Sequence, residues 1–403
     1  MTLWACDNAQ EEWTPGYNEN GTGNGNTTGN TGSTATNWSE RAKETYDAIV
    51  RFYEVKSGPT QGLYYENYPK GAGDGNASYL WPYDGFVAGV AMLNRLGYET
   101  GYKEKVDRFQ AYWRPYGAIA VGGYGSSTDG TNGGGDRFFD DNAIIGIELV
   151  EAYEQLGDPA YLNRCAQIIN FYNTGIDNTM GRALWWNESR RNIPGDGDSN
   201  KPACANGFAT WFLMRYYEVC PEGEKAEVLA LAKDLYKWLY ENLRDPEDNI
   251  YWNSKGADGS INRTKWTYNS GAMIAAGVRL YEATGDVKYL NEAKATANSS
   301  YDYFVRSRNG ISLCYPTNDP WFTIQLIKSY LELEPYNKDF CKKCMDTFIS
   351  NLENAWENGR MENGLFYEDW TGVNKNPDRD KSLLMQAAAL ESLAIVALYT
   401  AQP

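Results

Sequence analysis

A segment that recurs at a fixed interval restricts the fold of this chain more than any other feature. The segments YEQLGDPAYLN, from Tyr153, and YEATGDVKYLN, from Tyr281, share seven residues at corresponding places. Tyr217 and Glu218 take the matching place midway, so the interval is 64 residues in both steps, from 153 to 217 and from 217 to 281. Each copy is typical of the end of one helix, a tight turn and the start of the next.

Repeats of this length indicate stacked helical pairs, because one pair cannot bury its apolar face alone. The chain from Trp38 to Pro403 holds between five and six such units, which predicts an all-α fold. Six helical hairpins can close into an (α/α)6 barrel, whereas an open solenoid would need capping repeats, so we expect the barrel. Helical periodicity indicates about twelve helices, which begin near residues 39, 84, 103, 141, 159, 205, 223, 269, 286, 319, 336 and 382.

The connections between these helices alternate in length. Because consecutive helices run in opposite directions, all the long connections should lie at one end of the barrel. Long loops grouped on one face of a rigid scaffold are where a binding site is expected. The long connections fall near residues 57–83, 115–139, 175–204, 244–268 and 355–381, with an intermediate one at 307–318.

Aromatic and polar residues gather in these long loops. Sugar rings present apolar faces that stack on tryptophan and tyrosine, while asparagine and aspartate accept or donate hydrogen bonds to hydroxyl groups. Any single tryptophan is explained equally well by packing of a loop against the barrel end, but the group as a whole favours a glycan site. The candidates for substrate binding on this ground are Trp81, Tyr83, Asp84, Trp185, Trp186, Tyr268, Asn269 and Trp370.

Two adjacent aspartates, Asp140 and Asp141, stand where the loop 115–139 enters a helix. Aspartate is favoured in the first turn of any helix, so capping explains one of them. A second like charge beside it, flanked by apolar residues, favours a partly buried pair whose two pKa values are split. Glycoside hydrolysis needs such a pair, with one protonated and one ionised carboxyl. Spacing alone leaves capping and catalysis equally supported.

The absence of histidine excludes many other mechanisms. With no histidine in 403 residues, the chain holds no Ser-His-Asp triad and no HExxH zinc site. The formal net charge of −16 disfavours binding to nucleic acid or to anionic lipid. The sequence predicts no cofactor and no metal: the pair Cys341 and Cys344 in CKKC stands alone, and the loop GDGDSN lacks the glutamate of a calcium loop.

The front of the chain differs from the rest. LWAC, which ends at Cys6, resembles the end of a bacterial lipoprotein signal, although the basic and apolar segments that should precede it are missing. A run rich in glycine, asparagine and threonine follows, which indicates a flexible tether. We therefore expect residues 1–37 to form a lipoprotein-type N-terminus and tether, anchored by lipid at Cys6, and residues 38–403 to form one catalytic domain. No apolar run reaches the roughly 20 residues that span a bilayer.

Three segments resemble glycoside hydrolase family 76. They are FFDDNAIIGIELVEAYEQLGDPAYL, ALWWNES followed by KPACANGFATWFLM, and WTYNSGAMIAAGVRLYEATGDVKYLNEA. The resemblance implies an (α/α)6 barrel and an α-mannanase that cuts α-1,6-linked mannan internally with retention of configuration. It also implies that Asp140 is the nucleophile and Asp141 the acid/base, and that Asn206, like Tyr268 and Asn269, lines the cleft.

Several functions remain open at this point. We expect a retaining endo-α-1,6-mannanase, exported and tethered by lipid at an outer membrane surface or in the periplasm, and monomeric. A transglycosylase of the same family would share the chemistry until an acceptor sugar replaces water. A surface glycan-binding protein would keep the aromatic loops without needing both carboxylates, and a purely structural scaffold would need neither.

Overall fold

The computed structural model describes residues 36–128, 133–317, 319–375 and 381–401. The chain from Asn37 to Pro403 forms one compact unit. Cys6 and the expected tether up to residue 35 lie outside the described residues, whereas Asn37, the last residue assigned to the tether, is the N-cap of α1. The described part holds twelve α-helices, and each begins within four residues of its predicted start.

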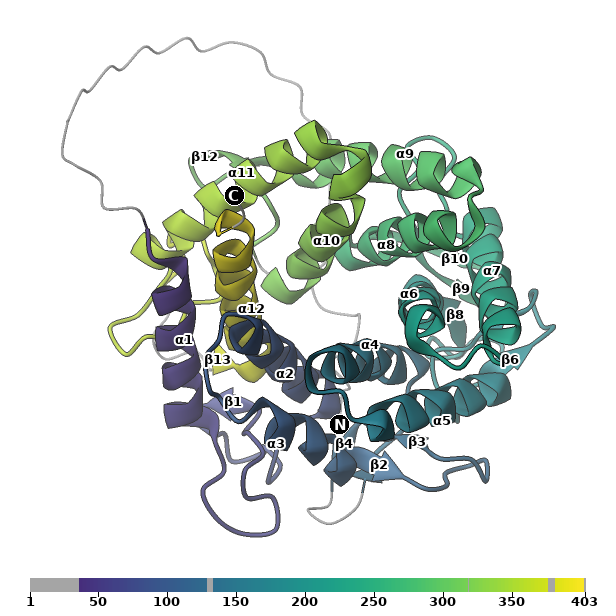
Figure 1. Ribbon diagram of the computed structural model, residues 1–403, viewed down its shortest axis with the longest axis horizontal. Helices are drawn as coiled ribbons and strands as arrows, with labels where there is room; N and C mark the ends of the chain where they lie inside the picture. The colour runs from purple at the N-terminus through teal and green to yellow at the C-terminus, as the bar shows by residue number, and fades with distance from the viewer. Residues whose placement is uncertain (1–35, 129–132, 318, 376–380, 402–403) are drawn as a thin grey trace. The chain divides into compact units, whose positions relative to one another are not determined.

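The helices form two concentric rings, as Figure 1 shows. The inner ring holds every second helix of the chain, and α2 packs against α12, which closes it. The predicted (α/α)6 barrel is therefore confirmed over an open solenoid. The inner helices are α2 (Leu80–Arg95), α4 (Phe139–Leu156), α6 (Ala203–Val219), α8 (Thr267–Thr284), α10 (Pro320–Leu333) and α12 (Leu383–Thr400). The outer helices are α1 (Trp38–Tyr53), α3 (Tyr102–Asp107), α5 (Pro159–Gly175), α7 (Lys225–Asn242), α9 (Val287–Phe304) and α11 (Lys338–Asn358), and 3-10 turns lie at Arg108–Tyr112 and Glu334–Tyr336.

The inner helix α12 is more apolar than the sequence pattern led us to expect. By length and composition it could cross a membrane, yet 78% of it is buried inside the barrel. A helix that is apolar on all sides is typical of the core of a large protein. Its composition therefore follows from its place in the inner ring.

The repeated segment turns out to be a helix stop followed by a helix start. Gly157 ends α4 with φ 71° and Gly285 ends α8 with φ 69°, a left-handed conformation that glycine adopts without strain. The next residue caps the following outer helix, because Asp158 accepts from the backbone N–H of Ala160 and Asp286 from that of Lys288, each at 3.0 Å. The repeat therefore encodes the tight turn from inner to outer helix.

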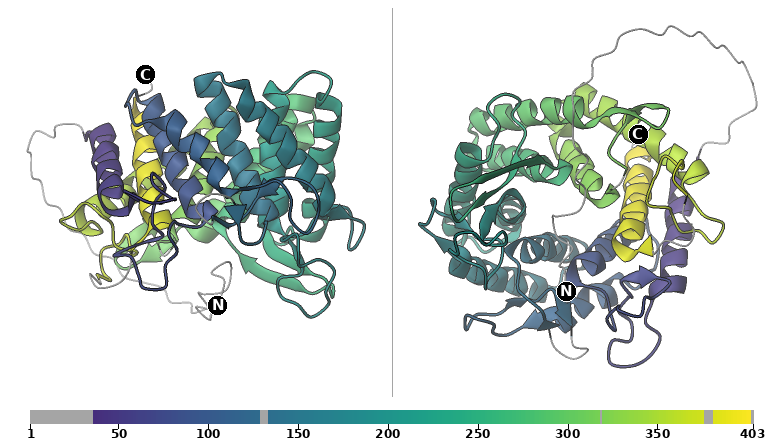
Figure 2. Two further views of the ribbon diagram at one scale, coloured as in Figure 1. Left: turned by 90° about the horizontal axis from the view of Figure 1, so that it is seen from below. Right: turned by 180° about the vertical axis from the view of Figure 1, so that it is seen from behind.

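Short antiparallel strands fill the long connections, and the helical pattern did not predict them. Figure 2 (left) shows them at one end of the helix rings. The largest sheet has the order β10-β9-β8, with Lys201 of β8 opposite Lys255 of β9. The strands are β1 (Asn67–Tyr68), β2 (Trp113–Arg114), β3 (Gly123–Tyr124), β4 (Ser127–Thr128), β5 (Gly133–Gly134), β6 (Ile176–Asp177), β7 (Ala183–Leu184), β8 (Asn200–Pro202), β9 (Trp252–Gly256), β10 (Ile261–Lys265), β11 (Arg306–Arg308), β12 (Ile311–Cys314) and β13 (Lys381–Ser382).

Side-chain amides at the start of the inner helices hold these loops in place. The Asn206 amide accepts from the backbone N–H of Leu184 and donates to the carbonyl oxygens of Leu184 and Pro202. Asn142 forms the same pattern with Tyr124. Each amide thus bonds both the backbone N–H and the carbonyl oxygen of one loop residue, as a neighbouring strand would.

Replacing Asn206 by alanine should therefore destabilise the fold. The change leaves the buried Leu184 N–H and the Leu184 carbonyl group without their amide partner, which costs about 1–3 kcal/mol. Urea unfolding would measure the loss, and Asn298→Ala, on the exposed face of α9, is the matched control. Equal unfolding midpoints for the two variants would contradict this role of Asn206.

Candidate active site

The two adjacent aspartates lie in the first turn of α4, but neither is its N-cap. Phe138 occupies the N-cap position, and no side chain caps the helix there. Both Asp140 and Asp141 are partly exposed at the loop end of the barrel. Capping thus leaves their presence unexplained, although the helix dipole still favours a negative charge at this place.

Three donors surround the Asp140 carboxyl. Its Oδ2 accepts from the indole Nε1 of Trp186 at 2.9 Å and from the Sγ of Cys204 at 3.1 Å. Its Oδ1 accepts from the backbone N–H of Asp141 at 3.0 Å. Burial raises the pKa of Asp140, but these hydrogen bonds to the ionised form oppose the rise.

The Asp141 carboxyl has a different environment. Among the described residues, none donates a hydrogen bond to it. Burial and then the charge of Asp140 raise its pKa well above the ordinary value. The pair is therefore asymmetric: hydrogen bonds favour the ionised form of Asp140, whereas burial and the neighbouring charge favour the protonated form of Asp141.

The second residue of each inner helix contributes to a ring at this end of the barrel. Several members of this ring contact one another. Cys204 contacts Asp140, and the aromatic side chains of Trp81 and Tyr268 have centroids 5.0 and 6.4 Å from that of Trp321. A Cβ added to Gly85 would meet both Trp321 and Leu384, which places these two side by side. The members are Trp81, Asp140, Cys204, Tyr268, Trp321 and Leu384.

Aromatic residues of α2, α8 and α10, with Trp266 at the N-cap of α8, form a wall at the loop end of the barrel. Phe322 is its centre, with ring centroids 4.1 Å from Tyr268, 5.5 Å from Trp266 and 5.9 Å from Trp81. The sequence placed Trp81 and Tyr268 here but did not single out Trp321 and Phe322. Their position in the rim segment CYPTNDPWF was the available signal.

Several buried polar atoms of this region have no partner within the described part of the chain. They are the indole N–H groups of Trp81 and Trp266, Oδ1 of Asn269 and Oδ1 of Asp319. Buried polar atoms in native proteins almost always have a partner, which can be water or a ligand. Asp319 was not a sequence candidate, and burial raises its pKa to about 7.

Four of the predicted sugar-binding side chains are buried inside the fold. The Tyr83 hydroxyl donates to the carbonyl oxygen of Lys105 at 2.8 Å, and the Trp185 indole donates to Asp177 at 2.6 Å. The Asn206 amide hydrogen-bonds to backbone atoms of Leu184 and Pro202, as described above. These three side chains and that of Asn269 have no exposed surface, so none presents a face to a sugar.

Asp84 belongs to a group of buried charges inside the barrel. Burial, then the charge of Glu148, raises its pKa well above the ordinary value, and Asp141 contributes in the same direction. Lys328 lies 2.9 Å from Glu391 and 3.9 Å from Glu148. This lysine is the cation that faces three carboxyl groups from α2, α4 and α12, so Asp84 is expected to remain protonated.

The profile of Glycosyl hydrolase family 76 matches residues 37–403. The chain belongs to glycoside hydrolase family 76. No curated protein matches it. A family 76 α-mannanase of Bacteroides thetaiotaomicron is 25% identical with a TM-score of 0.77, over 91% of this chain and 97% of that one.

Two further solved structures share the fold. A family 76 mannosidase of Bacteroides thetaiotaomicron is 23% identical with a TM-score of 0.76, over 91% of this chain and 99% of that one. An inactive α-1,6-mannanase variant of Salegentibacter sp. HEL1_6, with two adjacent aspartates replaced by alanine, binds α-1,6-mannotetraose. It is 22% identical with a TM-score of 0.70, over 90% of this chain and 99% of that one.

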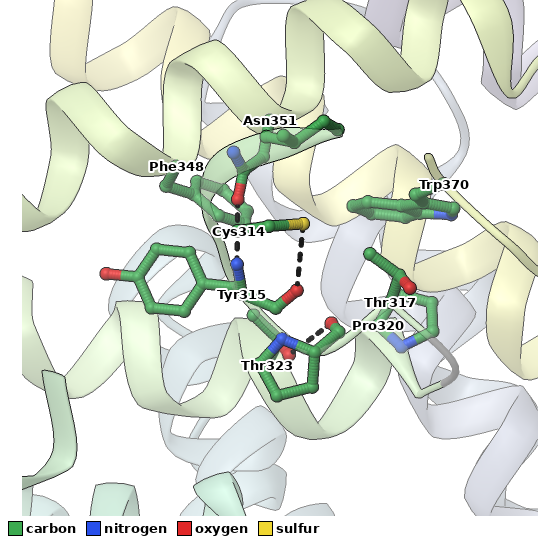
Figure 3. Close-up of a pocket in the computed structure, with 10 residues that line it drawn as sticks. Cys314, Tyr315, Thr317, Pro320, Thr323, Phe348, Asn351 and Trp370 are labelled. Atoms are coloured by element: carbon green, nitrogen blue, oxygen red, sulfur yellow. Dashed lines mark hydrogen bonds between the residues drawn. The ribbon is translucent and has the colours of Figure 1, made fainter. Parts of the chain in front are cut away.

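Trp370 of this family 76 chain lines a small apolar pocket away from α4. Figure 3 shows its ring above the pocket, with Cys314 and Pro320 nearby. The Cys314 thiol donates to the carbonyl oxygen of Tyr315 at 3.2 Å, and no residue of α4 lines the pocket. Trp370 is therefore part of the wall of this pocket, whose lining includes none of Asp140, Asp141, Trp186 and Cys204.

The residues of the two metal-like motifs of the family 76 chain make hydrogen bonds within the fold. Cys341 and Cys344 are buried thiols of α11, and Cys341 donates to the carbonyl oxygen of Tyr330. In the GDGDSN loop, Asp196 accepts from Arg190 at 2.7 Å and from the backbone N–H of Asp198 at 2.9 Å. The Asp196 carboxylate is thus already paired.

The stability of the family 76 domain should be greatest in mild acid. Burial raises the pKa of Glu66, Glu148 and Asp319 to about 7, so their protonation favours the folded state below the ordinary carboxyl pKa and is lost as the pH rises through 7. The pKa of Glu151 is shifted in the opposite direction. Burial opposes its ionisation, but Arg95 and Arg215 lower its pKa to about 2, so its contribution to stability is lost only in strong acid. The urea midpoint should fall from pH 5 to pH 8; a rise over that interval would contradict these assignments.

Proposed function

We propose that this family 76 enzyme is a retaining endo-α-1,6-mannanase. The observation that carries the proposal is the asymmetric pair, in which Asp140 is stabilised as an anion and Asp141 as an acid. Retaining glycosidases need both forms side by side. The Salegentibacter enzyme, whose inactive variant lacks two adjacent aspartates and binds an α-1,6-linked mannoside, supports both the residues and the linkage.

In the first step, Asp140 attacks the anomeric carbon and forms an ester with it. The glycosidic C–O bond breaks, and Asp141 gives its proton to the departing oxygen. In the second step, Asp141 removes a proton from water while the water oxygen attacks the same carbon. The ester bond breaks, Asp140 regains its charge, and two inversions give net retention.

The aromatic wall supports a polymeric sugar substrate. Trp81 is partly exposed and belongs to the same cluster as Trp266 and Phe322. Apolar sugar faces pack on such rings, and indole N–H groups have the chemistry to bind hydroxyl groups. For the location of the enzyme, we propose export and tethering through Cys6, which rests on the LWAC segment and the polar run after it.

The test is digestion of linear, debranched α-1,6-mannan, with products followed by chromatography and their anomeric configuration by proton NMR. Wild type should give a ladder of oligosaccharides whose new reducing ends are initially α. Asp140→Asn should give none, and Asp302→Asn, exposed on α9, should match wild type. Initially β products would refute retention. Longer products would indicate transglycosylation, and binding without cleavage would indicate a glycan-binding protein.

A further inference from the structure

Cys204 is the second residue of α6, and its thiol contacts the proposed nucleophile. The side chain is 3% exposed, and its Sγ lies 3.1 Å from Oδ2 of Asp140. Asp140 is the second residue of α4, so the repeat brings the two residues to matching places on neighbouring inner helices. A sulfur–oxygen distance this short indicates an S–H group that donates to a carboxylate.

The direction of this hydrogen bond follows from charge. An ionised carboxylate only accepts, so the thiol must donate. A thiolate at the same place would put two negative charges 3.1 Å apart in a partly buried site. Cys204 therefore stays protonated as long as Asp140 is ionised.

The donors are distributed unequally over the two carboxylate oxygens. Oδ2 takes both side-chain donors, Trp186 and Cys204, whereas Oδ1 takes one backbone N–H. A carboxylate oxygen has about two lone-pair sites. Both sites on Oδ2 are then occupied, and Oδ1 keeps one site for the anomeric carbon.

We propose that Cys204 is a positioning residue that, together with Trp186, anchors Oδ2 of Asp140 and leaves Oδ1 as the attacking atom. This inference rests on the proposed role of Asp140. In the ester intermediate, Oδ2 is an uncharged carbonyl oxygen and accepts weaker hydrogen bonds. When the ester breaks, the charge returns to Asp140 and both bonds strengthen, so the thiol favours the second step more than the first.

Replacing Cys204 by alanine tests the proposal. A purely structural role of Cys204 would change neither the pH profile nor the relative rates of the two chemical steps. We expect the acidic limb of kcat/KM to move to higher pH, because the carboxylate loses a donor. We also expect kcat on an activated aryl α-mannoside to fall about 10-fold, with accumulation of the mannosyl-enzyme detectable by mass spectrometry. Trp186→Phe should move the acidic limb in the same direction, and Cys204→Ser should restore it.

Cys165→Ala is the matched control, since Cys165 is another fully buried thiol of the barrel whose Sγ faces the carbonyl oxygen of Gly146 at 3.8 Å. It should change stability without moving the acidic limb. If Cys204→Ala keeps the wild-type acidic limb and accumulates no intermediate, the proposal is refuted. Activity of Asp140→Asn would instead refute the proposed function, and the two failures are thereby distinguished.

Discussion

Replacing Asp141 by alanine is expected to reduce cleavage of α-1,6-mannan by a factor on the order of 10⁴ or less while largely sparing formation of the intermediate from an activated substrate. The alkoxide that leaves a polysaccharide needs a proton, and Asp141 holds one because burial and the charge of Asp140 raise its pKa. A phenolate with electron-withdrawing groups leaves without that proton. The loss should therefore depend on the leaving group.

The measurement compares kcat/KM on mannan with kcat/KM on a dinitrophenyl α-mannoside. Azide should then restore turnover of the Asp141→Ala variant, because the anion fits the vacated space and attacks the ester without a general base. The product should be an α-mannosyl azide. Equal losses on both substrates and no response to azide would assign Asp141 a role other than acid/base.

Asp140→Asn should behave differently. It removes the attacking group itself, so the loss should reach at least about 10⁴-fold on both substrates. Azide should not restore an α product. The contrast between the two variants, rather than either loss alone, assigns the roles within the pair.

The fold could be predicted from the sequence because the 64-residue repeat and the helical periodicity both indicate the same unit, a pair of helices joined by a tight turn. The glycine and aspartate at residues 157–158 and 285–286 encode turns whose geometry is local, so their meaning does not depend on the rest of the chain. The short strands at the loop end are different. β8 pairs with β9 across some 50 residues of chain, and strands of two to five residues leave no periodic pattern to detect.

The sequence placed the candidate site at the first turns of the inner helices, but it did not separate side chains that face the barrel end from those that turn into the fold. One residue along a helix rotates a side chain by about 100°. The second residues of the inner helices, such as Trp81 and Asp140, belong to the ring at the loop end of the barrel. The fourth residues turn away and bond to backbone atoms: Tyr83, Asn142, Asn206, Ser270, Thr323 and Gln386 all do so. Only a structure fixes where each helix begins precisely enough to make that distinction.

Arg137→Met should be among the most destabilising single substitutions in the barrel. The guanidinium is 1% exposed and pairs with Glu188, with Nε 2.7 Å from Oε2 and Nη2 bonded to Oε1. It also donates to the carbonyl oxygens of Val121 and Ile119. Removing it leaves a buried carboxylate unpaired, which costs about 3–5 kcal/mol.

The same substitution should lower activity, since the ion pair joins the two segments that carry the site. Arg137 precedes the N-cap of α4, and Glu188 lies two residues after Trp186, the donor to Asp140. Backbone bonds from Glu188 to Arg137 and from Phe139 to Trp186 run alongside. Loss of the ion pair should weaken the hydrogen bond from Trp186 to Asp140. Because that bond favours the ionised carboxylate, the acidic limb of kcat/KM should then move to higher pH.

Urea unfolding and the pH profile would measure both effects. Arg182→Met is the matched control, because its side chain is 62% exposed and its contact with Asp234 spans 3.4 Å, so its loss should cost less than about 1 kcal/mol. The double variant Arg137→Met/Glu188→Leu should unfold at a higher urea concentration than Arg137→Met, because it no longer buries an unpaired charge. If Arg137→Met and Arg182→Met unfold at the same concentration, the buried pair contributes no more than a surface contact, and the loops must be held by the backbone bonds and the amides of α4 and α6.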